Sequence, residues 1–154
     1  MKMKKTGQQG FTLIELIIVI SVIAILIGIA LPRLRGMLEE GNVAKAAGEA
    51  KALQAAVESY YIHNSKTYPA DGSGWQAALT AAKPQLIGAA LKDPFKPTAD
   101  YIYDKSANGL YYIIWSTGFD GAGDITGIDD TGVLTGTQDD DIFVSNGTVG
   151  SGGF

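Results

Sequence analysis

Residues 11–31 read FTLIELIIVISVIAILIGIAL, and this stretch decides how the rest of the chain must be organised. It contains a single charged side chain, Glu15. As an α-helix it is about 31 Å long, which is enough to cross the hydrocarbon core of a bilayer. Three lysines lie within the first five residues. The positive-inside rule therefore places the N-terminus in the cytoplasm and the rest of the chain across the membrane.

Two simpler interpretations of this stretch leave something unexplained. A secretory signal peptide has an apolar core of about 7 to 15 residues and then a small-residue cleavage site, whereas this run is longer and continues into Pro32, Arg33 and Leu34. An uncut membrane anchor does not explain Glu15, because an ionised carboxylate inside the bilayer costs about 2.5 to 3.5 kcal/mol. Glu15 needs a partner charge.

Composition limits what the rest of the chain can be. A length of 154 residues suffices for one modest domain. Cysteine is absent, which excludes disulfides, thiolate metal sites and cysteine nucleophiles. The net charge is −4, and residues 116–154 hold seven aspartates without any Lys or Arg. Because no basic stripe is present to meet phosphates, we expect no nucleic-acid partner.

No group of residues resembles a catalytic centre, and we expect no enzyme. The single histidine, His63, falls near the predicted end of a long helix, and neither a GxSxG nor a GxxxxGK[ST] motif is present. Aromatic residues at alternating strand positions usually form core and cross-strand pairs. The aromatic residues assigned to the core in this way are Tyr101, Tyr103, Tyr111, Tyr112 and Trp115.

The helical pattern continues past Pro32 as an amphipathic segment to about His63. Pro32 lacks an amide donor and crowds the preceding turn, so we expect a helix kink or a locally opened stretch there. Alanines on this segment suit either a soluble coiled coil or a helix lying closely under a sheet, and we favour the sheet. The alanines in question are Ala44, Ala47, Ala50 and Ala55.

The remainder alternates between turn-forming and strand-forming composition. Residues 64–74 are predicted to form a loop, and residues 75–91 to form short helical patches broken by Pro84 and Gly88. Residues 101–104 and 110–116 are predicted to be strands. The pair Asn108–Gly109 lies between them, which indicates an antiparallel hairpin. The second strand, LYYIIWS, is apolar on both faces.

Residues 4–34, KKTGQQGFTLIELIIVISVIAILIGIALPRL, closely resemble the class III signal and first helix of type IV pilins and type II secretion pseudopilins. The resemblance implies that a prepilin peptidase cuts between Gly10 and Phe11 and N-methylates Phe11. It also implies that Glu15 neutralises the Phe11 amine of a neighbouring subunit during assembly. Two opposite charges in a low-dielectric setting are each costly alone and much less so together. Loss of the leader lowers the side-chain charge from −4 to −7.

The resemblance narrows over residues 93–143, which are similar to the major pseudopilins of type II secretion systems. A DP-aromatic turn at 93–95 is followed by SxGxDG at 116–121 and GTxDDDI at 136–142. In that family the C-terminal loop binds calcium, a hard cation that takes six to eight oxygen ligands. The matched positions imply a structural calcium with Asp120, Asp140 and Asp141 as ligands. The alternative ligands are Asp139, Asp124, Asp129 and Asp130.

Two points stay open at the acidic loop. Residues 122–135 are longer than the family's link between the two acidic motifs, so the register of the loop is not fixed by the resemblance. The simpler interpretation is a solvated acidic loop without any ion. No EF-hand spacing is present, because the glutamate at the last ligand position is missing.

The sequence thus predicts an α+β, pilin-like fold, in which a long N-terminal transmembrane and amphipathic helix packs on a small antiparallel sheet. Residues 1–10 form the leader, 11–31 the membrane and polymerisation helix, and 32–154 a periplasmic domain. The expected role is a structural subunit of a type II secretion pseudopilus, a filament that helps to drive protein export. Expected partners are further copies of the chain, minor pseudopilins, the inner-membrane assembly platform and the prepilin peptidase. The alternatives are a type IVa pilin, or a membrane-anchored periplasmic enzyme or binding protein.

Processing provides the first test. We expect the membrane-extracted protein to begin at Phe11, because the basic leader, Gly10 and the apolar helix together match the peptidase signal. Intact-mass measurement decides between the two forms. A mature protein that still carries residues 1–10 contradicts both the cleavage and the assembly that depends on it.

Overall fold

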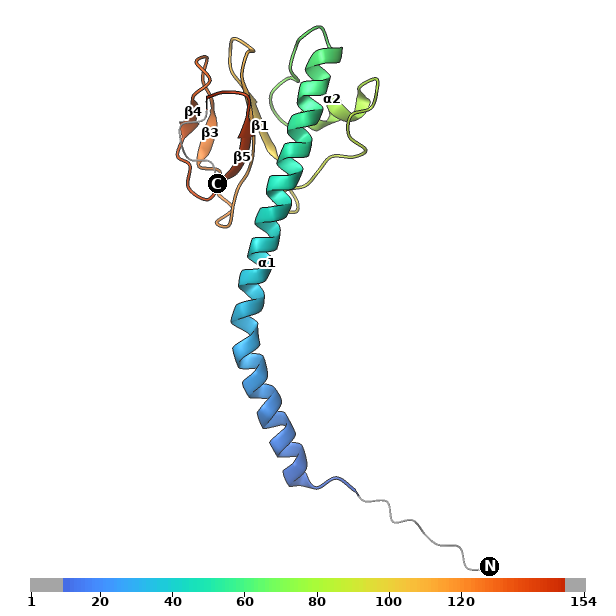
Figure 1. The fold of residues 1–154 in the computed structure, drawn as a ribbon, viewed down its shortest axis with the longest axis vertical. Coiled ribbons are helices and arrows are strands. Elements are labelled where there is room, and N and C mark those ends of the chain that lie inside the picture. Colours follow the sequence, from blue (N-terminus) through green and yellow to red (C-terminus); the bar gives the residue numbers. More distant parts are fainter. Residues whose placement is uncertain (1–9, 149–154) are drawn as a thin grey trace, which may run out of the picture. The chain divides into compact units, whose positions relative to one another are not determined.

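In the computed structural model, residues 10–148 are described, and the chain divides into two units, residues 1–38 and 39–154 (Figure 1). Helix α1 (Leu13–His63) contributes its first part to one unit and its second part to the other. The boundary lies six residues beyond the expected one at Pro32. Leu34, Met37 and Leu38 remain exposed, which explains why this stretch is not counted with the domain.

The first unit is the apolar part of α1. An 18-residue window of this helix has a mean hydropathy of 3.0, and by length and composition the helix can cross a membrane. Its large apolar side chains are exposed along the whole span. Pro32 lies inside α1, and the backbone on both sides of it stays helical, so the locally opened stretch is not present. The bend at Pro32 stays a prediction.

The second unit adds one short helix and five short strands to the rest of α1. These elements are α2 (Trp75–Ala81), β1 (Ile102–Lys105), β2 (Tyr112–Ser116), β3 (Ile125–Ile128), β4 (Leu134–Gly136) and β5 (Ile142–Ser145). The strands form a three-stranded antiparallel sheet of order β1-β2-β5 and a two-stranded sheet, β3-β4. The α+β, pilin-like arrangement predicted from the sequence is confirmed, as is the β1–β2 hairpin.

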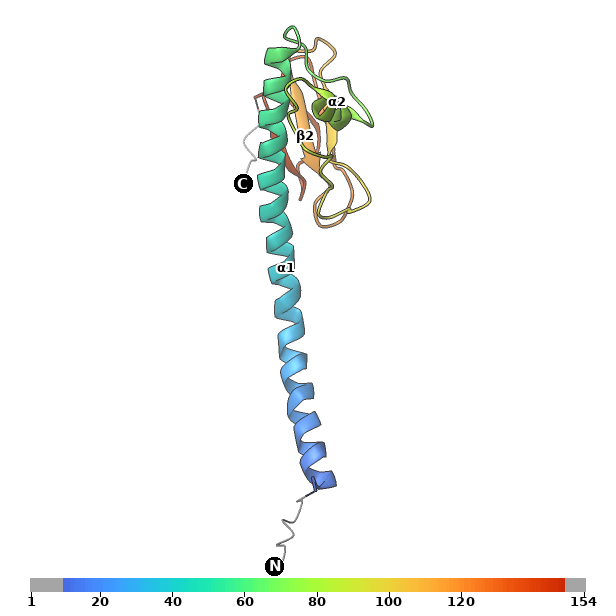
Figure 2. The ribbon, with the colours of Figure 1, turned by 90° about the vertical axis from the view of Figure 1, so that its right-hand side faces the viewer.

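The domain half of α1 packs on one face of the β1-β2-β5 sheet (Figure 2). Ala50, Leu53 and Val57 are fully buried there, against Tyr112 and Ile114 of β2. Small residues let the helix approach the sheet closely, so the prediction of a helix under a sheet, rather than a coiled coil, is confirmed. The buried stripe is shifted from the predicted alanines, however, because two of those four alanines face solvent.

Two tyrosine hydroxyls fix the sheet along the helix. Tyr101 donates to Glu49 Oε2 at 2.7 Å, and Tyr112 donates to Glu58 Oε1 at 2.7 Å. Burial raises the pKa of both phenols above the usual value, so both stay protonated and keep donating at any physiological pH. Since β1 follows Tyr101 and β2 begins at Tyr112, the two bonds place opposite ends of this hairpin at different heights on α1.

Strand β2 is buried on both faces, and the second face is covered by the β3–β4 hairpin. Its residues alternate, with Tyr112 and Ile114 toward α1 and with Ile113 and Trp115 toward the hairpin. The second core consists of Ile113, Trp115, Ile125, Ile128 and Phe143. The inserted stretch 122–135, which left the loop register open in the sequence, therefore forms most of a hairpin that completes the fold. Strands β3, β4 and β5 were not predicted.

The DP-aromatic turn is held by a buried carboxylate. Asp93 is 1% exposed. Its Oδ1 accepts hydrogen bonds from the Phe95 amide at 2.9 Å and from the Ser116 hydroxyl at 2.8 Å. Its Oδ2 accepts from the Thr117 amide at 2.9 Å and from the Thr117 hydroxyl at 3.2 Å. Asp93 thus ties the turn to the end of β2, where the acidic loop begins.

We expect Asp93→Asn to destabilise the domain by about 2 kcal/mol. The amide has one acceptor oxygen instead of two, so a buried donor loses its partner, at a cost of about 1 to 3 kcal/mol. Ser116→Ala, which removes a single donor to the same carboxylate, is the matched control and should cost less. Denaturant unfolding of the mature chain in detergent, followed by tryptophan fluorescence, measures both. Equal stability of Asp93→Asn and the wild type contradicts the role of this carboxylate.

Candidate functional site

The first candidate site is the start of α1. Gly10 and Phe11 precede the helix, and the Phe11 side chain is 93% exposed. The predicted cleavage bond therefore lies in an extended, accessible segment directly before the first helical turn. The basic leader itself, residues 1–9, lies outside the described residues.

A capping box closes this end of the helix. The Glu15 Oε2 oxygen accepts hydrogen bonds from the Thr12 amide and the Thr12 hydroxyl, both at 2.9 Å, and the Glu15 amide donates back to Thr12 Oγ1 at 3.3 Å. A threonine N-cap with a glutamate three residues later satisfies two otherwise unpaired amides. The spacing T-x-x-E is visible in the sequence, but this role of Thr12 was missed there.

Glu15 consequently has a partner within its own chain, and that partner is neutral. The hydrogen bonds orient the carboxylate at the helix N-terminus, three residues from the position where cleavage would create the Phe11 amine. The charge of Glu15 is not compensated by Thr12. The pairing of Glu15 with a neighbouring Phe11 amine stays a prediction, now with a pre-oriented carboxylate.

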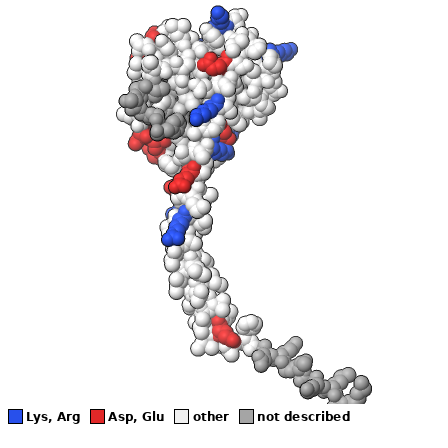
Figure 3. All heavy atoms as spheres, viewed as in Figure 1, with Lys and Arg blue, Asp and Glu red and all other residues white. Residues whose placement is uncertain are grey.

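The second candidate site is an acidic group at the base of the β3–β4 hairpin. Carboxylate oxygens of Asp120, Asp124 and Asp140 lie within 4.8 Å of one another. They come from the loop after β2, the residue before β3 and the loop before β5. Figure 3 shows acidic side chains gathered in one patch of the domain surface. The sheet topology thus brings the two acidic motifs of the sequence together.

Asp140 is anchored by the turn after β2. Its Oδ2 oxygen accepts hydrogen bonds from the Phe119 amide and, at 3.0 Å, from the Asp120 amide. The approach requires glycine at position 118, where φ is +61° and a Cβ would stand 2.5 Å from the Asp140 carboxyl carbon. The Asp140 Oδ1 oxygen is buried and has no hydrogen-bond partner among the described residues. An acceptor in this state suits a cation.

The structure differs from the sequence on the third member of the group, which is Asp124 rather than Asp141. Asp141 is 9% exposed, and its Oδ2 accepts hydrogen bonds from the amides of Asp124 and Ile125, both at 2.8 Å. Neighbouring side chains on an extended segment point to opposite sides, so Asp140 and Asp141 serve different neighbours. Asp141 Oδ1 is buried and lacks a hydrogen-bond partner among the described residues, so this carboxylate keeps one free oxygen.

The other alternative ligands lie elsewhere. Asp139 is exposed and is not part of the three-carboxylate group. Asp129 accepts hydrogen bonds from Thr131 and Val133 within the turn between β3 and β4. Asp130 accepts one from the Asn108 amide at 2.7 Å, which joins this turn to the β1–β2 turn. These two aspartates shape the hairpin tip.

Electrostatics oppose full ionisation of the acidic group. Desolvation, followed by the charges of Asp120, Asp139 and Asp140, raises the pKa of Asp124. Burial likewise raises the pKa of Asp141, although its two amide donors act in the other direction. A group whose pKa is raised by folding destabilises the folded state once pH exceeds its pKa in the unfolded chain. At neutral pH the ionised group is therefore strained, and a bound cation would relieve it.

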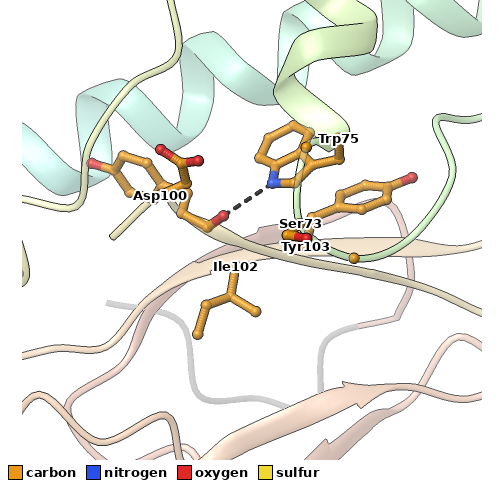
Figure 4. Close-up of a pocket in the computed structure, with 8 residues that line it drawn as sticks. Ser73, Trp75, Asp100, Ile102 and Tyr103 are labelled. Atoms are coloured by element: carbon orange, nitrogen blue, oxygen red, sulfur yellow. Dashed lines mark hydrogen bonds between the residues drawn. The ribbon is translucent and has the colours of Figure 1, made fainter. Parts of the chain in front are cut away.

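A separate pocket of about 310 Å³ lies between the loop before α2 and the start of β1 (Figure 4). Trp75 stacks on Tyr103 with ring centroids 4.8 Å apart, and its indole N–H donates to the Tyr101 carbonyl at 3.0 Å. The charged residue at its rim, Asp100, forms an ion pair with Lys92 at 2.7 Å. The aromatic side chains are held by the core, as the sequence predicted.

Comparison with known proteins defines the class first. Residues 5–31 match the prokaryotic N-terminal methylation motif, and residues 33–132 match type II secretion system protein G. With the pilin-like fold, these matches define a membrane-anchored, pilin-like protein. The second match covers well over half of the chain, and the chain belongs to the type II secretion system protein G family. That family is one of structural pseudopilins rather than enzymes.

Individual relatives agree with this assignment. The chain is 35% identical over 78 residues to type II secretion system core protein G of Klebsiella michiganensis, which is 51% of this chain and 54% of that protein. It is 37% identical over 79 residues to the protein of the same name from Vibrio cholerae, covering 51% and 52%. The chain thus spans about half the length of the curated relatives it matches.

Proposed function

We propose that this chain is the repeating subunit of a type II secretion pseudopilus. The observation that carries the proposal is the methylation motif at residues 5–31, joined to a protein G domain at 33–132. Its relatives are named type II secretion system core proteins. The subunit is inserted in the inner membrane, with its N-terminus in the cytoplasm and its domain in the periplasm, and then polymerises into a periplasmic filament that helps to drive protein export.

The N-terminus supplies the chemistry of assembly. Cleavage after Gly10 creates an amine at Phe11, and the Glu15 carboxylate of a neighbouring subunit neutralises it in the apolar interior of the filament. Neither charge has a cheap alternative there, since each alone is costly in a low-dielectric setting. The partners in this process are further copies of the chain, minor pseudopilins, the assembly platform and the prepilin peptidase. The work comes from a cytoplasmic ATPase, since the sequence holds no phosphate-binding loop of its own.

We further propose that the acidic group holds a structural calcium ion. Asp120, Asp124 and Asp140 supply carboxylate oxygens, and the free oxygen of the neighbouring Asp141 can join or replace one of them. Hard oxygen ligands on a glycine-rich backbone fit calcium better than magnesium, which demands tighter octahedral geometry. The ion would neutralise the base of the hairpin and fix the loop after β2 to the loop before β5.

The function is tested by deletion of the gene and two assays, export of secreted proteins and surface piliation. Loss of export with surface pili intact supports the pseudopilus, whereas loss of pili with export intact supports a type IVa pilin. Glu15→Gln sharpens the test, because glutamine at this position still completes a capping box but carries no charge. We expect membrane insertion to persist and sheared filaments to be lost, since breaking a buried charge pair costs about 3 to 5 kcal/mol.

Ser21→Ala is the matched control for Glu15→Gln. Ser21 is another polar residue of the same span, and its hydroxyl donates to the Ile17 carbonyl of its own helix at 2.7 Å. Its removal should leave filament yield unchanged. Normal filament yield from Glu15→Gln would contradict the pairing role while leaving the family assignment intact.

Thermal melts of the mature chain with calcium, magnesium or chelator test the ion. We expect calcium to raise the melting temperature the most, with a gain of about 2.7 kcal/mol at a hundredfold excess over Kd. Asp124→Asn should lose most of the calcium response yet melt higher than the wild type in chelator at neutral pH, because the strained charge is gone. That advantage should shrink as pH falls toward the ordinary range of an aspartate, where Asp124 itself is protonated. Equal melting of the wild type with calcium and with chelator would leave the loop merely acidic.

A further inference from the structure

An aromatic pair stands exposed beside the acidic group. The Phe95 and Phe119 rings meet edge to face, with centroids 5.1 Å apart, and the Phe119 side chain is 52% exposed. Phe119 is held in place from below, because its amide donates to the Asp140 carboxylate. The pair is thus a rigid apolar feature that the described part of the chain leaves largely uncovered.

The rim of this pair on the Phe119 side is acidic. Asp120 follows directly in the chain, and Asp139 precedes the residue that binds the Phe119 amide. Both are exposed, and among the described residues neither forms an ion pair. On the Phe95 side, Lys96 is exposed. The partner that fits this surface has an apolar core to cover the rings and a cation to meet the aspartates.

The chain itself carries such a complement on α1, after the end of the apolar span. Leu34 and Leu38 are 53% and 69% exposed and lie one turn apart on the same helix face. At about 100° per residue, Arg35 lies about 80° from the centre of this stripe, and it is the nearest charge. Glu39 and Glu40 lie about 120° and 140° away. The stripe therefore presents two leucines with an arginine at their edge.

We propose that the Leu34–Leu38 stripe with Arg35 of one copy docks on the Phe95–Phe119 pair with Asp139 of a second copy. This interface rests on the proposed polymerisation and adds the surfaces that join subunits outside the membrane. Two different patches on one chain make a head-to-tail contact, which propagates into an open filament rather than closing a dimer. Aromatic and arginine side chains are also the types that dominate binding energy in protein interfaces.

Cross-linking tests the contact directly, because the wild-type chain contains no cysteine. Mature chains carrying Leu38→Cys and Phe119→Cys, assembled in cells and treated with a short bis-maleimide, should give a ladder of multimers. The control pairs Leu38→Cys with Leu110→Cys. Leu110 is 61% exposed but lies before β2, whereas Phe119 lies after it. A ladder from the control alone, or from neither variant while filaments form, overturns the interface and leaves the proposed function standing.

Charge reversal tests the same interface without cysteines. Arg35→Glu and Asp139→Arg should each lower filament yield about tenfold through like-charge contact, and the double variant should recover it. Arg33→Glu is the matched control, since Arg33 lies about 120° from the stripe and should not rescue Asp139→Arg. Failure of Arg35→Glu to rescue, or equal rescue by both arginine variants, overturns the assigned pair. If the wild-type chain forms no filament at all, the proposed function fails first and the interface with it.

Discussion

Burial of strand β2 on both faces is the constraint on which the rest of the domain depends. All five residues from Tyr112 to Ser116 are at most 4% exposed. A strand that is apolar on both sides needs a layer on each side. The helix α1 supplies one layer and the β3–β4 hairpin the other. The domain is therefore a three-layer structure around one strand, and it would expose a large apolar surface if either cover were missing.

The same strand places the acidic group. Ser116 and Thr117, at its end, bind the buried Asp93, and the turn that follows brings Phe119 and Asp120 against Asp140. The hairpin then begins one residue after Asp124. Stability and charge are thus coupled at one point, because the residues that close the second core also bring like charges together. A cation at this point would serve the fold before it served any other purpose.

The start of α1 shows how one side chain can serve two conditions. Within a single chain Glu15 completes a capping box with Thr12, which is worth about 0.5 to 2 kcal/mol to a helix end. A hydrogen-bonded carboxylate at a helix N-terminus is also favourably placed in the field of the helix dipole. Neither interaction cancels its charge. In an apolar surrounding that residual charge favours contact with an amine, which gives a physical reason for subunits to associate at this end.

The sequence by itself determined the features that depend on neighbouring residues along the chain. Hydropathy gave the membrane-length helix, periodicity carried it to His63, and Asn108–Gly109 gave the β1–β2 hairpin. Motif matches identified the two acidic segments, and Asp120 and Asp140 do meet. These features are local, because a helix face or a tight turn is specified within a few residues.

The tertiary structure alone decided what depends on contacts between distant segments. Nothing local distinguishes Asp124 from Asp141 as the third carboxylate, since the choice depends on which side of the loop faces Asp120. The buried role of Asp93 depends on Ser116 and Thr117, more than twenty residues away. Likewise, the stretch 122–135 reads as a glycine-rich loop, and it becomes mostly a hairpin because its isoleucines can be buried against Trp115. Such pairings depend on topology, and residues far apart in the chain are brought together by burial rather than by their neighbours.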